Sequence, residues 1–210
     1  PYTTLFRSCR QARRIMNITV YCGSSMPENR AFQQVARELG EWIAREGHEL
    51  VYGGSRVGLM GIVSGTVLEA GGRVHGVETS FFVDAGVARD NLTELFVVDT
   101  MAERKAKMIE LGDAFVALPG GVGTLEEMSE IMSRIRLGMD PSACYFLNID
   151  GFYDNLRAFL DDMVREGFLD DVDLGRICFP ETLDELVRLL EADFANPRES
   201  FATAAEMMRR

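Results

Sequence analysis

The segment from Ala114 to Glu127, AFVALPGGVGTLEE, sets a glycine-rich turn and two carboxylates directly after an apolar run. Residues 114–118 have the length and character of a strand buried on both faces of a parallel sheet. The glycines of the turn lack the Cβ atoms that would keep a ligand away from the backbone. Thr124 is predicted to cap the following helix, with Glu127 as its capping-box partner. Together these features predict a phosphate-binding cradle beside a carboxylate.

Other interpretations of this turn remain open. Glycine turns between a strand and a helix also occur without a bound phosphate, and Glu127 could serve only as a cap. The turn is not a P-loop, because no Gly-Lys-Ser/Thr follows it. It also lacks the third glycine of a dinucleotide fingerprint, since Glu126 occupies that position. The pattern therefore favours a monophosphate over a dinucleotide.

A short basic segment, MAERKAKM at residues 101–108, is the second candidate for chemistry. Lys105 and Lys107 are the only lysines in the sequence, and both lie beside Arg104 at a predicted helix start. They could form a solvated helix face. Alternatively, Arg104 and Lys105 could pair with phosphate or carboxylate groups. In a chain of formal net charge −11, a local positive cluster near a glycine turn is a reasonable anion site.

Strand and helix patterns alternate along the chain, which predicts an α/β fold of three layers, a parallel sheet with helices on both faces. The predicted strands are 18–22, 49–52, 73–77, 95–98, 114–118 and 144–147. The predicted helices are 28–46, a segment after Gly61 that ends at 70, 100–111, 124–137, 152–166 and 182–192. Residues 78–93 are less regular, as a flap or short helix would be.

Three of the predicted strands end in small or glycine-rich turns. These turns are Gly23-Ser24, Gly53-Gly54 and Gly120-Gly121. Because the carboxyl ends of parallel strands lie at one edge of the sheet, all three turns are expected at the same site.

Length and composition limit the class of protein. At 210 residues, with 47% apolar and 26% charged residues, the sequence predicts one domain over residues 16–194. Residues 1–15 are expected to be an extension outside the domain, and 195–210 a loosely docked tail. The acidic charge argues against nucleic-acid binding, and no apolar run approaches the ~20 residues of a membrane span. Four scattered cysteines and two histidines predict neither a metal site nor disulfides, as in a cytoplasmic protein.

Six motifs together resemble the LOG ("lonely guy") family, whose members are often mislabelled lysine decarboxylases. The similarity covers about residues 17–170, and the ERKA and PGGxGTxxE elements in that order are specific to this family and its near relatives. The motifs are VYCGSS (20–25), LVYGG (50–54), VGLMG (57–61), ERKA (103–106), PGGVGTLEE (119–127) and GFYD (151–154).

The resemblance implies a Rossmann-like homodimer, with its site near the subunit interface, that needs no cofactor. Family members cleave the N-glycosidic bond of nucleoside 5′-monophosphates, AMP or cytokinin riboside 5′-monophosphates, to free base and ribose 5-phosphate. Arg104 and Glu127 match the catalytic pair. The implied substrate-binding residues are Gly23, Ser24, Gly53, Gly54, Met101, Lys105, Pro119, Gly120, Gly121, Val122, Gly123 and Thr124.

In this chemistry, a carboxylate beneath C1′ stabilises the oxocarbenium-like charge of the transition state. Glu127 is expected to fill this role and to orient or deprotonate the attacking water. The glycine turn would hold the 5′-phosphate, and Arg104 would keep Glu127 ionised. No residue is identified as the acid that protonates the departing base.

The sequence departs from the family pattern at several positions. Ala102 replaces a common histidine, and the usual proline is absent around residues 76–79. Arg134 and Arg136 replace tryptophan and glutamine, which could widen the pocket or add an anion contact. The preferred base is therefore open. The alternatives are a non-catalytic nucleotide or molybdopterin carrier and a broader nucleotide nucleosidase. Lysine decarboxylation would need pyridoxal phosphate, and neither lysine has a recognisable Schiff-base context.

Overall fold

The computed structural model describes residues 15–139 and 143–196. Most of the predicted extension at 1–15 and of the predicted tail at 195–210 lies outside these residues, so both stay predictions. Within the described residues, seven parallel strands form one sheet in the order β4-β3-β2-β1-β5-β6-β7. The strands are β1 (Asn17–Tyr21), β2 (Glu49–Tyr52), β3 (Arg73–Thr79), β4 (Glu94–Val98), β5 (Ala114–Ala117), β6 (Cys144–Phe146) and β7 (Ile177–Cys178).

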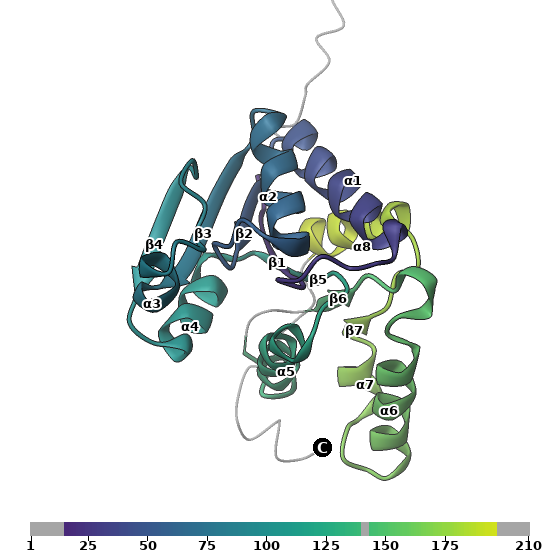
Figure 1. Ribbon diagram of the computed structural model, residues 1–210. Coiled ribbons are helices and arrows are strands. Elements are labelled where there is room, and N and C mark those ends of the chain that lie inside the picture. Colours follow the sequence, from purple (N-terminus) through teal and green to yellow (C-terminus); the bar gives the residue numbers. More distant parts are fainter. Residues whose placement is uncertain (1–14, 140–142, 197–210) are drawn as a thin grey trace, which may run out of the picture.

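Helices cover both faces of this sheet (Figure 1). One apolar core joins the sheet to α1 (Arg30–Glu46), α2 (Gly58–Glu69) and α8 (Leu183–Ala195). A second core joins the opposite face to α4 (Met101–Leu111), α5 (Val122–Arg136) and α6 (Asp154–Arg165). The three-layer α/β fold is therefore confirmed. Shorter helices are α3 (Ser80–Asp84), α7 (Asp171–Leu174) and the 3-10 helix η1 (Ile149–Gly151).

The strand β5 explains why a continuous apolar run predicts a central strand. Ala114 and Val116 pack into the first core, whereas Phe115 and Ala117 pack into the second. Every residue of β5 is buried, as expected for a strand covered by helices on both faces.

The ends of α1 follow local capping rules. Asn29 caps the helix by accepting a hydrogen bond from the Ala31 N–H at 2.9 Å, so the helix begins two residues after the predicted position 28. Gly47 ends it with φ of 76°, a left-handed conformation that favours glycine.

The predicted cap of the helix after the glycine turn is wrong. Helix α5 begins at Val122, with Gly121 at the N-cap and no capping side chain. Thr124 is buried within the first turn, and the carboxylate of Glu127 binds Arg104 instead. The turn is shorter than predicted because the backbone of Gly121 is already in position to start the helix.

A true capping box occurs at the start of α4. The Thr100 hydroxyl accepts a hydrogen bond from the Glu103 N–H at 3.2 Å, and Glu103 accepts one from the Thr100 N–H at 3.1 Å. This box fixes the first turn of the helix that carries Arg104.

The order of the strands creates a switch point between β1 and β5. From β1 the chain adds strands outward to β4, and it then returns to add β5, β6 and β7 on the other side. Ligands of such sheets bind outside the carboxyl ends of the strands at this point. The turns after β1 and β5 meet there, because the Gly23 N–H donates to the Pro119 carbonyl at 3.1 Å.

In the described part of the chain, none of the helices is both long enough and apolar enough for a bilayer crossing.

Candidate active site

A cavity of about 540 Å³ opens at the carboxyl ends of β1, β2 and β3, between α4 and α5. Most of the site residues expected from the sequence line it. These are Gly23, Ser24, Gly53, Met101, Arg104, Gly121, Val122, Gly123, Thr124 and Glu127. The remaining expected residues, Gly54, Lys105, Pro119 and Gly120, do not line the cavity.

The side chain of Arg104 is fixed by three elements. It is 6% exposed, and its Nε and Nη2 donate to the carbonyls of Val77 and Gly53 at 3.0 and 3.1 Å. Its Nη1 donates to Glu127 Oε1 at 2.8 Å. The guanidinium is therefore held in a single orientation by the ends of β2 and β3 and by the second turn of α5.

Only a glycine fits at position 53 beside this guanidinium. A Cβ built on Gly53 would lie 1.9 Å from Arg104 Nη2 and 3.0 Å from the Met60 sulfur. The missing Cβ at this position therefore leaves room for the Arg104 side chain.

Glu127 faces the cavity from α5 with 11% of its side chain exposed. Burial raises the pKa of its carboxyl above the ordinary value, and the charge and hydrogen bond of Arg104 oppose the rise. The carboxylate is thus poorly hydrated and paired with one cation, a state suited to stabilising positive charge or accepting a proton.

The start of α5 has the features expected of an anion cradle. The first helical hydrogen bond is donated by the Leu125 N–H to the Gly121 carbonyl, so the N–H groups of residues 122–124 have no acceptor within the helix. A Cβ on Gly121 or Gly123 would meet no atom within 4 Å, so this surface is open to a ligand. The dipole of this 15-residue helix favours an anion at the same place.

Two glycines of the turns do not line the cavity themselves but leave room for residues that do. A Cβ on Gly120 would lie 2.2 Å from the Thr124 hydroxyl oxygen. Gly54 has φ of 78°, and a Cβ there would lie 2.9 Å from the Glu78 Cβ. Gly120 and Gly54 therefore let Thr124 and Glu78 take their positions.

Both lysines form ion pairs with neighbouring carboxylates. The Lys105 ammonium contacts Glu126, which lines the cavity, and lies 3.0 Å from Glu130 Oε2. Lys107 lies 2.8 Å from Glu110 and above the Phe96 ring. The basic segment thus separates into one arginine inside the site and two lysines outside its lining.

The two arginines that depart from the family pattern also lie outside the lining. Arg136 Nη1 is 2.8 Å from carboxylate oxygens of both Asp170 and Asp173, which ties α5 to α7. The expected pocket widening or second anion contact is therefore not the role of Arg136.

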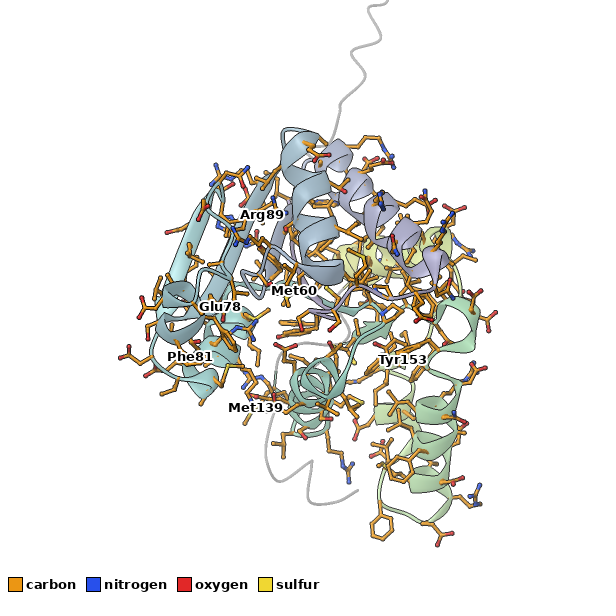
Figure 2. The ribbon with its side chains drawn as sticks, in the orientation of Figure 1. Met60, Glu78, Phe81, Arg89, Met139 and Tyr153 are labelled. Carbon is orange, nitrogen blue, oxygen red and sulfur yellow. The ribbon has the colours of Figure 1, made fainter. Side chains whose placement is uncertain are left out.

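Sequence reasoning missed several residues that line the cavity. The most important is Glu78, a buried carboxylate at the end of β3 whose neighbour in the lining, Met60, comes from α2. In Figure 2 the labelled Glu78 and Met60 lie at the same end of the sheet. A signal was present, because Glu78 follows a predicted strand at the same edge as the glycine turns. Other missed residues are Tyr21, Cys22, Ser55, Val57, Phe82, Val87 and Met108.

Among residues 15–139 and 143–196, no three His, Cys, Asp or Glu side chains are grouped to hold a metal ion. The site instead combines an open helix N-terminus with a buried Arg–Glu pair at the switch point. Fold and site together define a Rossmann-like α/β protein with an open helix N-terminus at its switch point, the kind of place that favours an anion.

Comparisons with known proteins give the family. The family model described as "Possible lysine decarboxylase" matches residues 60–190. The rice protein "Cytokinin riboside 5′-monophosphate phosphoribohydrolase LOG" (Oryza sativa subsp. japonica) is 42% identical over 178 residues, covering 85% of this chain and 74% of its own. A Rhodococcoides fascians cytokinin riboside 5′-monophosphate phosphoribohydrolase is 41% identical, covering 84% and 89%. The chain therefore belongs to this family, and the resemblance to LOG proteins is confirmed.

Solved structures share the fold at lower identity. The molybdenum cofactor binding protein of Rippkaea orientalis has a TM-score of 0.67 and 21% identity, covering 87% of this chain and 99% of its own. The molybdenum cofactor carrier protein of Chlamydomonas reinhardtii has a TM-score of 0.66 and 19% identity, covering 87% and 100%. At this identity the likeness concerns the fold alone.

Proposed function

We propose that this protein is an N-glycosidase that hydrolyses nucleoside 5′-monophosphates, AMP or cytokinin riboside 5′-monophosphates, to free base and ribose 5-phosphate. The observation that carries the proposal is the buried Arg104–Glu127 pair, which faces a cavity beside the open start of α5. The names of the relatives at 42 and 41% identity support the same activity.

In the proposed complex, the 5′-phosphate binds the free N–H groups of residues 122–124. Glu127 lies one turn further along the same helix, so a sugar attached to that phosphate extends toward its carboxylate. As the C1′–N bond breaks, the carboxylate stabilises positive charge at C1′ and accepts a proton from the attacking water.

Arg104 acts on the orientation and charge of Glu127. Its three hydrogen bonds leave the carboxylate little freedom, and its positive charge favours the ionised form that the reaction needs. Lys105 contributes at the rim, where its partner Glu126 borders the cavity. The glycines at 23, 53, 54 and 120, with Ser24, Met101 and Pro119, complete the proposed substrate-binding set.

Two alternatives are less well supported. A lysine decarboxylase of the pyridoxal phosphate type needs a lysine for its Schiff base, and neither Lys105 nor Lys107 lines the cavity. A molybdopterin or nucleotide carrier would use the anion cradle, but it would have no need for a buried carboxylate paired with arginine.

We further propose that residues 16–194 act as one catalytic domain in a cytoplasmic homodimer whose interface lies near the site. Exposed apolar side chains at the cavity support this interface, since Met101 and Val122 are uncovered in the single chain. Sedimentation analysis at micromolar concentration measures the oligomeric state.

The decisive experiment incubates the protein with AMP and with cytokinin riboside monophosphates and measures free base and ribose 5-phosphate separately. We expect equal amounts of both products, and Glu127→Gln should lose at least ~100-fold in rate. Glu126→Gln is the matched control, because it alters the adjacent and more exposed carboxylate. Binding of nucleotide without either product would refute the proposal in favour of a carrier.

A further inference from the structure

Glu78 is a second carboxylate that lines the cavity. Like that of Glu127, its side chain is held by defined contacts. It is 4% exposed at the end of β3 and lines the cavity. Its Oε1 accepts a hydrogen bond from the Thr79 N–H at 2.9 Å and lies 3.4 Å from Arg104 Nε. Because both contacts use Oε1, Oε2 is the oxygen available to a ligand.

The charges around Arg104 do not balance. Among the described residues that line the cavity, Arg104 is the cation and Glu78, Glu126 and Glu127 are the carboxylates. Glu126 is paired with Lys105, which leaves one guanidinium between two buried carboxylates. Burial raises the pKa of each of these two carboxyls, so each retains a proton more readily than an ordinary glutamate does.

The contacts decide which carboxylate holds that proton. Glu127 has a direct hydrogen bond from Arg104 Nη1 at 2.8 Å. Glu78 lies 3.4 Å from Arg104 Nε, whose N–H is already donated to the Val77 carbonyl at 3.0 Å. Glu127 is therefore the better-stabilised anion, and Glu78 is the better candidate for the protonated acid. Unequal environments of this kind divide acid from base between two carboxylates.

We infer, on the basis of the function proposed above, that Glu78 is the acid that gives its proton to the departing base. In this step the C1′–N bond breaks, its electron pair stays with the base, and the Glu78 proton moves to a ring nitrogen. Water forms the new C1′–O bond and gives a proton to Glu127. Exchange with solvent then returns Glu78 to the acid form and Glu127 to the carboxylate.

The surroundings of Glu78 suit the base end of a nucleotide. Apolar side chains that follow β2 and β3 along the chain line the same cavity, namely Val57, Met60, Phe82 and Val87. The proposed phosphate cradle is the start of α5, the helix that follows β5. Glu78 is on β3, which lies on the other side of β1 and is separated from it by β2. A ligand bound along this edge thus has its phosphate near α5 and its base near Glu78.

The titration of Glu78 is consistent with this role. Burial raises its pKa, against the opposing effects of the Thr79 N–H and of Arg104. The other charged or titratable groups that line the cavity are Arg104, Glu126, Glu127, Tyr21 and Cys22. Burial raises the pKa of both Tyr21 and Cys22, so these two stay neutral at the pH of the reaction.

The test compares AMP with a purine nucleotide methylated at N7, whose base is already cationic and leaves without a proton. We expect Glu78→Gln to lose at least ~100-fold in kcat on AMP and far less on the methylated nucleotide. Glu127→Gln should lose on both substrates, since water activation is needed for both. Glu94→Gln, an exposed carboxylate on the neighbouring β4, is the control for loss of a negative charge.

An equal loss of Glu78→Gln on both substrates, or no loss on AMP, would overturn the assignment while leaving the proposed hydrolase intact. A wild type that releases no base from any nucleotide would instead overturn the proposed function, and the inference with it. The wild type alone provides a second test. Its rate on AMP should fall as the pH rises through the pKa of Glu78, and this limb should be absent with the methylated nucleotide.

Discussion

Replacing Gly53 by alanine should displace Arg104 while leaving the fold in place. The new Cβ would lie 1.9 Å from Arg104 Nη2, where ordinary contact begins at 3.4 Å. The guanidinium must therefore withdraw by the difference, about 1.5 Å, because the Cβ is fixed to the backbone and the arginine side chain is the flexible partner. A movement of that size breaks the bond to the Gly53 carbonyl and pulls Nη1 away from Glu127.

We expect a large loss of catalysis in a protein that still folds. A misplacement of ~1 Å in a catalytic site costs about 100-fold in rate, which corresponds to ~2.7 kcal/mol of transition-state stabilisation. The stability loss should be about 1–3 kcal/mol, the range for weakened buried hydrogen bonds. We therefore expect Gly53→Ala to unfold cooperatively, at a lower temperature than the wild type, with kcat/KM for AMP reduced about 100-fold.

The assay follows ribose 5-phosphate release over a range of AMP concentrations, with thermal unfolding measured on the same samples. Gly175→Ala is the matched control. It makes the same substitution at the end of α7, where a Cβ would lie 3.3 Å from its nearest neighbour and outside the cavity. Wild-type kcat/KM in a folded Gly53→Ala protein would refute the claim that the position of Arg104 governs the reaction.

Two further predictions concern stability. The pKa values of Glu78 and Glu127 are raised chiefly by burial, so the folded state binds more protons than the unfolded one between the unfolded pKa of about 4.3 and the folded pKa. Wild-type stability is lost as the pH rises through that window. Glu78→Gln has no such proton to lose, so its free energy of unfolding should rise relative to that of the wild type as the pH increases through this window. Urea unfolding that shows the same pH dependence for both proteins would contradict this. Arg136→Ala should lose about 1–3 kcal/mol of stability, because Asp173 is 1% exposed and loses its cation. AMP turnover should not change in this variant, since Arg136 does not line the cavity; a slower rate at unchanged folding would show a link from α7 to the site.

The strands and the positions of the turns could be predicted because their signals are local. The apolar run at 114–118 requires burial on both faces, and Gly47 ends α1 by its own backbone preference. The common edge of the three turns then follows from parallel pairing alone. Short elements such as α7 and β7 were missed because four and two residues carry no readable period.

Other features depend on packing that the sequence does not display. Thr124 has the residue type of a cap, yet it is buried because Gly120 leaves room for its hydroxyl. Glu127 fits a capping-box pattern, but its partner is 23 residues away in sequence. Glu78 has no motif of its own, and only the packing of α4 against β3 brings it beside Arg104.

Two of the three hydrogen bonds that hold Arg104 go to main-chain carbonyls, those of Gly53 and Val77. A new side chain at position 77 changes the core and not the position of the main-chain carbonyl, so substitution there need not move the guanidinium. A slip of one residue in the alignment of β2 with β3, in which Tyr52 now lies opposite Gly76, would move the two acceptors out of reach of a single guanidinium. The position of this charge thus depends on the course of two adjoining strands, and it should persist when surrounding amino acids other than Gly53 diverge.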